Sequence, residues 1–194
     1  MKVLKGILIF IGAIVVLYFV VALFLPTSYE LDRSIIINKS PDVVFGQVSD
    51  FNNWMGWNPW TKMEPTAKST ISGQPGTVGH SWEWDGKQIG SGKLTFAAIT
   101  PPQSIHSKMV FYRPMEGTAT DDWTFESTEG GTKVTWTSAG ELPYGAARYM
   151  GLMMDSMLGT QMEQGLSDLK GICESLPEMD TQNEKMEEET SGSN

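Results

Sequence analysis

The chain has 194 residues, 40% of them apolar and seven of them tryptophan, which is enough for one domain with a substantial hydrophobic core. Its formal net charge of −9 argues against a nucleic-acid partner, because binding to phosphates requires a cationic surface. A single cysteine, Cys173, and two histidines, His80 and His106, supply too few ligands for a cysteine-rich or multi-histidine metal centre. We therefore predict no metal site, no cofactor and no internal disulfide.

Residues 6–25, GILIFIGAIVVLYFVVALFL, contain no charged side chain. At helical rise this run spans about 30 Å, the thickness of the hydrocarbon layer of a bilayer. The alternative is a cleaved signal peptide, whose apolar region normally has about 7–15 residues and ends in a small-x-small motif. Because this run is longer and ends in Phe24-Leu25-Pro26, we predict that residues 1–28 form a retained single-pass anchor with its linker.

The charges that flank the apolar run set the expected orientation. Lys2, Lys5 and the terminal amine precede the run, whereas Arg33 and Lys39 beyond it are accompanied by acidic residues. The positive-inside rule counts mainly Lys and Arg, and by a small margin it places the N-terminus in the cytoplasm. We therefore expect the rest of the chain to lie outside the cytoplasm.

The segments after the anchor predict a strand followed by short helices. Residues 29–38 alternate apolar and polar side chains and then become β-branched, as strands do. Ser40-Pro41-Asp42 supplies a capping hydroxyl, a proline at the first helical position and an acid in the first turn, so a helix should begin there. Residues 53–60 hold three tryptophans around a proline, which predicts a short helix or a tight turn.

A run of strand-like segments follows a polar, glycine-rich connector at residues 68–79. Short turn signals separate the segments, and connections of this length imply antiparallel hairpins. The strand-like segments are residues 80–85, 92–100, 105–112, 118–126 and 132–141.

Residues 144–176 carry apolar side chains at steps of three and four, the period of one face of an α-helix, and Pro177 ends the run. We predict one continuous helix of roughly 50 Å that packs its methionine-rich stripe against the sheet. The remaining residues, 177–194, are acidic and poor in apolar side chains, which predicts a disordered tail.

Every second residue of a strand lies on the same face of a sheet, and here one face is apolar. Alternation alone favours a packed core behind this face, since apolar stripes mostly reflect packing. A curved sheet over flexible methionines can instead leave an apolar pocket. The apolar face comprises Trp82, Trp84, Leu94, Phe96, Ala98, Ile105, Met109, Phe111, Ala119, Trp123, Phe125, Val134 and Trp136.

Four motifs follow one another in a characteristic order: RSIIINKSPDVVF at 33–45, DFNNW at 50–54, WNPW at 57–60 and GTKVTW at 131–136. Together with the closing helix they resemble the SRPBCC superfamily, which includes START, Bet v 1 and polyketide cyclase/dehydrase-like proteins. The resemblance covers residues 29–176. It implies an α+β helix-grip fold, a curved antiparallel sheet wrapped around a long C-terminal helix, here preceded by one transmembrane helix.

The resemblance is closest to small bacterial polyketide cyclase-like proteins with an N-terminal membrane helix, which implies the bacterial inner membrane and a deep cavity under the sheet. Trp57 and Trp60, with Trp54, could form the mouth of that cavity, cap the core or touch the bilayer interface, where tryptophan is favoured. The predicted ligand-binding residues are Trp57, Trp60, Trp82, Trp84, Phe96, Met109, Phe111, Asp121, Trp123, Trp136, Met150 and Met154.

Asp121 and His80 are the candidate catalytic residues. Asp121 shares the apolar face of its strand, where burial would raise the pKa of its carboxyl and suit it to acid–base chemistry. Alternatively, a strand end or a bulge leaves it in solvent. His80 could donate a hydrogen bond to a ligand or be an ordinary hydrogen-bonded histidine at a strand end. Cys173 lies on the helix stripe and is expected to be a small buried side chain.

Three hypotheses of function follow. The first is a membrane-anchored binding module that holds a hydrophobic small molecule or lipid in the helix–sheet cavity, with the membrane contacted through residues 6–25. The second is a cyclase- or hydrolase-type enzyme that uses Asp121 or His80. The third is a structural or interaction protein without a ligand. The aromatic and methionine lining and the anchor beside a lipid reservoir favour the first.

Overall fold

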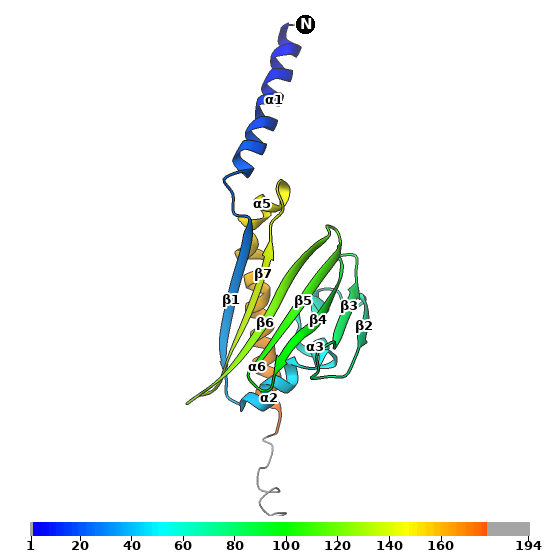
Figure 1. Ribbon diagram of the computed structural model, residues 1–194, viewed down its shortest axis with the longest axis vertical. Helices are drawn as coiled ribbons and strands as arrows, with labels where there is room; N and C mark the ends of the chain where they lie inside the picture. The colour runs from blue at the N-terminus through cyan, green and yellow to red at the C-terminus, as the bar shows by residue number, and fades with distance from the viewer. Residues whose placement is uncertain (1, 178–194) are drawn as a thin grey trace, which may run out of the picture.

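The computed structural model describes residues 2–177, and within them a seven-stranded antiparallel sheet curves around helices on one side (Figure 1). This is the α+β helix-grip architecture that the motifs imply, with an apolar helix in front of it. The predicted acidic tail lies outside the described residues, apart from Pro177.

The apolar helix α1 (Lys2–Ala22) stands away from the domain (Figure 1). Among the described helices, it is the one whose stretch Val3–Ala22 is long and apolar enough to cross a membrane. A membrane anchor and a signal sequence share this length and composition. The side chains of Val3 to Val21 are exposed, as expected for a helix that has no protein around it.

The sheet has the strand order β1-β7-β6-β5-β4-β3-β2, and all neighbouring pairs are antiparallel. Strand β2 lies in the stretch that the sequence analysis interprets as a connector. It was missed because this edge strand is short and its side chains are mostly polar and exposed. The strands are β1 (Ser28–Ile37), β2 (Lys68–Ser72), β3 (Ser81–Asp85), β4 (Ser91–Thr100), β5 (Ser104–Arg113), β6 (Gly117–Thr128) and β7 (Gly131–Glu141).

The predicted apolar face of the sheet is the buried one, with a single reversal. Ala98 is exposed and Ile99 packs against the core, because the pairing of β4 with β5 shifts by one residue between Phe96 and Ala98. A bulge of this kind moves every later side chain of the strand to the other face.

Three short helices fill the concave side: α2 (Pro41–Val48), α3 (Phe51–Trp57) and α4 (Pro59–Met63). Asn58 begins α4, and its side-chain oxygen accepts hydrogen bonds from the backbone N–H groups of Trp60 and Thr61. The predicted capping hydroxyl of Ser40 makes no such bond, so α2 starts on its proline instead.

The predicted continuous helix over 144–176 is wrong, because the structure divides this stretch into α5 (Ala146–Gly151), a π-helical turn η1 (Asp155–Gly159) and α6 (Thr160–Ser175). The Arg33 guanidinium from β1 lies at the junction. Its Nη2 is 2.6 Å from an Asp155 oxygen and its Nε is 2.7 Å from a Glu163 oxygen. Gly159 has no side chain, which leaves the space that this guanidinium occupies.

Candidate functional site

Tryptophan side chains occupy the space between the sheet and the helices. Trp54 and Trp57 of α3 meet Trp123 of β6 and Trp136 of β7, and each of the four is at most 1% exposed. Trp123 and Trp136 are paired across the two strands, and their rings stack with centroids 4.4 Å apart. The Trp57 ring meets the Trp123 ring edge to face at 5.7 Å. We call these four residues the tryptophan cluster.

Asp121 contacts two members of this cluster, Trp123 and Trp136. It is two residues before Trp123 on the same face of β6 and is 2% exposed. Its Oδ1 accepts a hydrogen bond of 2.6 Å from the Trp136 indole, and its Oδ2 accepts one of 3.3 Å from the Trp123 indole. One carboxyl group therefore satisfies both stacked indoles, and neither oxygen is left without a donor.

Burial raises the pKa of Asp121 to about 7, although the two indole hydrogen bonds act in the opposite direction. A carboxyl with this pKa exchanges its proton near neutral pH, which is a property of general acids and bases. The alternative of a solvated Asp121 is wrong, since the alternation of β6 continues through it and its side chain is buried.

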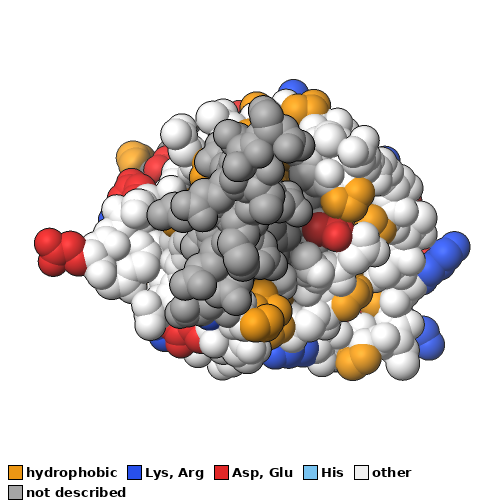
Figure 2. Space-filling model, turned by 90° about the horizontal axis from the view of Figure 1, so that it is seen from below, with side chains coloured by type: hydrophobic (Ala, Val, Ile, Leu, Met, Phe, Trp, Pro, Cys, Tyr) orange, Lys and Arg blue, Asp and Glu red, His pale blue; other side chains and the backbone are white. Residues whose placement is uncertain are grey.

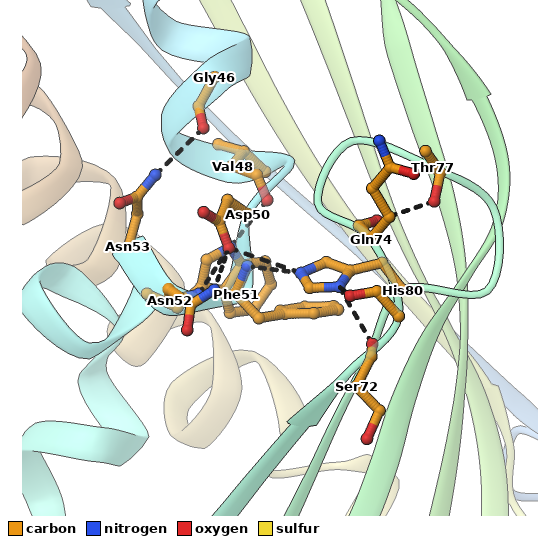
Figure 3. A network of polar contacts seen from close by, with 12 residues as sticks. Gly46, Val48, Asp50, Phe51, Asn52, Asn53, Ser72, Gln74, Thr77 and His80 are labelled. Carbon is orange, nitrogen blue, oxygen red and sulfur yellow. Dashed lines mark hydrogen bonds and ion pairs between the residues drawn. The ribbon is translucent and has the colours of Figure 1, made fainter.

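His80 is buried between the start of β3 and the helices (Figure 3). Its Nε2 accepts a hydrogen bond of 3.1 Å from the backbone N–H of Phe51. Its Nδ1 lies 3.1 Å from the carbonyl oxygen of Ser72, so this nitrogen carries the proton and donates a hydrogen bond to that oxygen. Both ring nitrogens thus form hydrogen bonds that hold α3 against the β2–β3 connection. This agrees with the alternative that His80 is an ordinary hydrogen-bonded histidine.

A recess of about 150 Å³ opens beside the tryptophan cluster, at the β2–β3 edge of the sheet. Trp82 connects the two, since its ring lies 6.2 Å from the Trp54 ring and forms part of the recess wall. Apolar and polar side chains share the lining. It consists of Met55, Thr61, Glu64, Pro65, Ala67, Ser69, Trp82 and Ile89.

Glu64 forms the acidic part of this lining. Its two carboxylate oxygens accept hydrogen bonds from the backbone N–H groups of Lys87, Gln88 and Ile89, at 2.8–3.1 Å. These bonds to backbone N–H groups lower the pKa of the Glu64 carboxyl, so it stays ionised at neutral pH. The carboxylate therefore fixes the β3–β4 turn as one wall of the recess.

The predicted ligand-binding residues fall into four groups. Trp82 lines the recess, and Trp84 lies next to it with a ring separation of 5.0 Å. Met150 is exposed outside the core, which corrects the expectation of a methionine stripe packed along the whole helix. Phe96, Asp121, Trp57, Trp123 and Trp136 are buried in the core, while Trp60, Met109, Phe111 and Met154 are half-buried.

Sequence reasoning missed most of the recess. Met55, Glu64 and Ile89 lie in α3 and in two turns, where no apolar period marks them. The sequence feature that could have indicated the recess was the WNPW motif. It marks the break between α3 and α4, which lies between Met55 and Glu64. In the described part of the chain no group of three His, Cys, Asp or Glu side chains could hold a metal ion. Cys173 is buried, and burial raises the pKa of its thiol to about 11.

Comparisons with known proteins agree with this fold. Residues 29–174 match the family model described as polyketide cyclase/dehydrase and lipid transport. A search of curated proteins gave no match.

Solved structures share the fold at low sequence identity. CV1439 from Chromobacterium violaceum has a TM-score of 0.56 at 15% identity, over 78% of this chain and 99% of its own. SA2116 from Staphylococcus aureus, a protein of unknown function, has a TM-score of 0.57 at 14% identity, over 76% of this chain and 94% of its own. The di-domain ARO/CYC StfQ from the steffimycin biosynthetic pathway has a TM-score of 0.60 at 11% identity, over 76% of this chain and 52% of its own. Likenesses at such identities show the fold alone.

Proposed function

The chain belongs to the polyketide cyclase/dehydrase and lipid transport family, and we propose that it is a membrane-anchored module that binds a small hydrophobic molecule or the apolar end of a lipid. The observation that carries this proposal is the recess of about 150 Å³ with Trp82 in its wall. An aromatic face, a methionine and a few fixed polar groups are what small-molecule sites usually combine. The anchor is α1, with the domain outside the cytoplasm.

The size of the recess limits the ligand. A cavity of about 150 Å³ holds a group about as large as benzene, whereas sites for drug-sized ligands have roughly 300–1,000 Å³. The tryptophan cluster fills the space between the sheet and α6, where a whole lipid would otherwise lie. We therefore infer that an aromatic ring or a chain end enters beside Trp82, and that the rest of a larger ligand stays outside.

The test uses full-length protein in nanodiscs with 5-fluorotryptophan at its seven tryptophans. The Trp82 resonance is assigned with Trp82→Phe, and benzyl alcohol is the probe. We expect saturable shifts at Trp82 and none at Trp123. Ala67→Phe should fill the recess and abolish the shift, while Val78→Phe, on an exposed loop, should leave it intact. Equal shifts in both variants would mean that the probe only partitions into lipid.

The anchor is tested separately. We expect the protein to stay in the membrane pellet after alkaline carbonate extraction, and a reporter fused after Asn194 to be active only outside the cytoplasm. A soluble mature protein without α1 would show that the helix is a signal sequence. A reporter active in the cytoplasm would reverse the orientation.

Acid–base catalysis by Asp121 is the second candidate, and the observation in its favour is the raised pKa of that carboxyl. The recess lining does not include Asp121, and both of its oxygens already accept hydrogen bonds from indoles. A turnover found by substrate screening and abolished in Asp121→Asn would support catalysis. Unchanged turnover in that variant would remove Asp121 from the mechanism.

A further inference from the structure

Residues 144–157, between β7 and α6, contact the end of the apolar helix, and we call them the juxtamembrane segment (Figure 1). The Tyr144 hydroxyl donates a hydrogen bond of 2.6 Å to the carbonyl oxygen of Phe19. The Tyr149 hydroxyl donates one of 2.6 Å to the carbonyl oxygen of Tyr18, and the two tyrosine rings stack at 4.6 Å. Side chains of the segment therefore contact both the backbone and a side chain of α1.

Arg148 completes this contact. One of its guanidinium nitrogens donates a hydrogen bond of 2.8 Å to the carbonyl oxygen of Ala22, the last residue of α1. The last four carbonyls of a helix lack partners within the helix, and the negative end of the helix dipole favours a cation there. Side chains of the domain thus serve as the C-terminal cap of the apolar helix.

These contacts fix how deep the segment lies if α1 spans a bilayer. Tyr18 lies four residues before the end of Val3–Ala22, and at about 1.5 Å per residue this is about 6 Å inside the end of the span. Because the Tyr149 hydroxyl bonds to Tyr18, its ring must lie at the boundary between hydrocarbon and headgroups. Tyrosine is enriched at that depth in membrane proteins.

The segment continues from Tyr149 into an exposed apolar surface. Leu152, Met153 and Met157 are 63%, 57% and 54% exposed, and Met150 is exposed beside them. Large apolar side chains gathered in this way on a surface normally mark an interaction site. At the opposite end of the molecule, the visible hydrophobic side chains lie mostly as separate spots among charged and other polar groups (Figure 2).

We propose that the juxtamembrane segment lies in the interface of the bilayer that holds α1, with Leu152 and Met153 inserted among the lipids. This inference rests on the proposed function in one respect, namely that α1 is a retained anchor. The domain is then held against the membrane by two attachments, α1 and this segment. It does not swing on a flexible linker.

A lipid surface fits this segment better than a partner protein does. The apolar surface is continuous with the end of α1 through Tyr144, Arg148 and Tyr149, so the bilayer around α1 already reaches it. Burial of apolar area is then the main source of binding energy, because Arg148 is the one cation in residues 144–157 and already bonds to α1.

The test measures depth with single labels. Cys173 is buried, and burial raises the pKa of its thiol to about 11, so a cysteine introduced at the surface can be labelled selectively. Leu152→Cys, Val78→Cys and Ile14→Cys are labelled with the fluorophore NBD in the full-length protein. Each is placed in phosphatidylcholine nanodiscs with or without doxyl-labelled lipid. Val78 is equally exposed, but its loop bonds to Ser49 after α2, at the end of the domain opposite α1 (Figure 1).

The expected result is about twofold quenching by doxyl lipid at positions 14 and 152, and none at position 78. Quenching at position 14 with position 152 unquenched would overturn the proposed docking and leave the anchor in place. An unquenched label at position 14 would overturn the anchor itself, and the docking with it. As a second measurement, Met153→Asp should reduce the quenching at position 152, whereas Val78→Asp should leave it unchanged.

Discussion

The tryptophan cluster and the juxtamembrane segment both contain large apolar side chains, yet one is buried and the other is exposed. The cluster lies where β6 and β7 face α3 and α6, so each ring finds a partner within the chain. Residues 150–157 continue the apolar period of α6, but Leu152, Met153 and Met157 are exposed, whereas the buried apolar side chains of this stretch lie in α6 itself. An apolar period in the sequence therefore predicts a helix, while the burial of its side chains depends on which elements of the fold pack against them.

Truncation should separate the two regions most clearly. Trp123→Ala should lower the free energy of unfolding by about 4 kcal/mol, because it removes a buried aromatic ring and leaves a cavity. Leu152→Ala should change it by less than about 0.5 kcal/mol, as exposed positions do. Chemical denaturation of the protein in detergent measures both. Equal losses would mean that Leu152 packs within the protein.

The pH dependence of stability tests the enclosure of Asp121. Its folded pKa of about 7 lies above the ordinary value of 3.8, so the folded state binds the proton more tightly. The stability that this proton contributes is complete below about pH 4 and is lost as the pH rises to about 7. Asp121→Asn stays neutral, so its stability relative to the unsubstituted protein should rise by a few kcal/mol between those pH values. Parallel pH profiles would contradict the enclosure.

Two glycines of α6 allow a packed position and an open position to be compared within one helix. A Cβ on Gly165 would lie 3.0 Å from Pro59 and 3.0 Å from the Trp136 ring, so Gly165→Ala should cost about 1–3 kcal/mol. No atom lies within 4 Å of a Cβ on Gly171, and Gly171→Ala should stabilise the helix by about 0.5–1 kcal/mol. Thermal unfolding of both variants gives the difference, and a gain in both would show that α6 is loosely packed.

A smaller loss of stability than at Trp123 or Gly165 is expected at the junction between the two regions. Arg33→Ala removes the contacts with Asp155 and Glu163, which are exposed carboxylates, and should cost about 1 kcal/mol or less. Hydrogen exchange of residues 155–159 should become faster, because the guanidinium no longer holds η1 against β1. Arg33→Lys should have an intermediate effect, and unchanged exchange in both variants would mean that η1 needs no support from Arg33.

Sequence reasoning predicted the strands and the C-terminal helical stretch because their signals were periodic, whereas the helix-grip arrangement followed from the resemblance of the motifs to the SRPBCC superfamily. The alternation of β6 correctly placed Asp121, Trp123 and Phe125 on one buried face. The π-helical turn between α5 and α6 carries no periodic signal, and Arg33, which contacts it through Asp155, lies more than 120 residues earlier in the sequence. The recess was missed for a similar reason, since Glu64 binds a turn that is distant from it in the sequence.

The choice between core and cavity also lay beyond a single sequence. Alternation identifies which side chains point inward, but whether they meet depends on the separation of the sheet and the helices. In the structure the Trp57 and Trp123 rings are in contact, and the free volume lies beside them at Trp82. A short, polar edge strand such as β2, which borders that volume, carries little periodic signal.

The capping of α1 by Tyr144, Arg148 and Tyr149 has a consequence for biogenesis. These side chains are 125–131 residues downstream of the carbonyls they bind. In the proposed anchored arrangement, the ribosome delivers α1 to the membrane long before it has synthesised the groups that complete the end of this helix. Until the last quarter of the chain has been translated and folded, water or lipid headgroups must serve in their place.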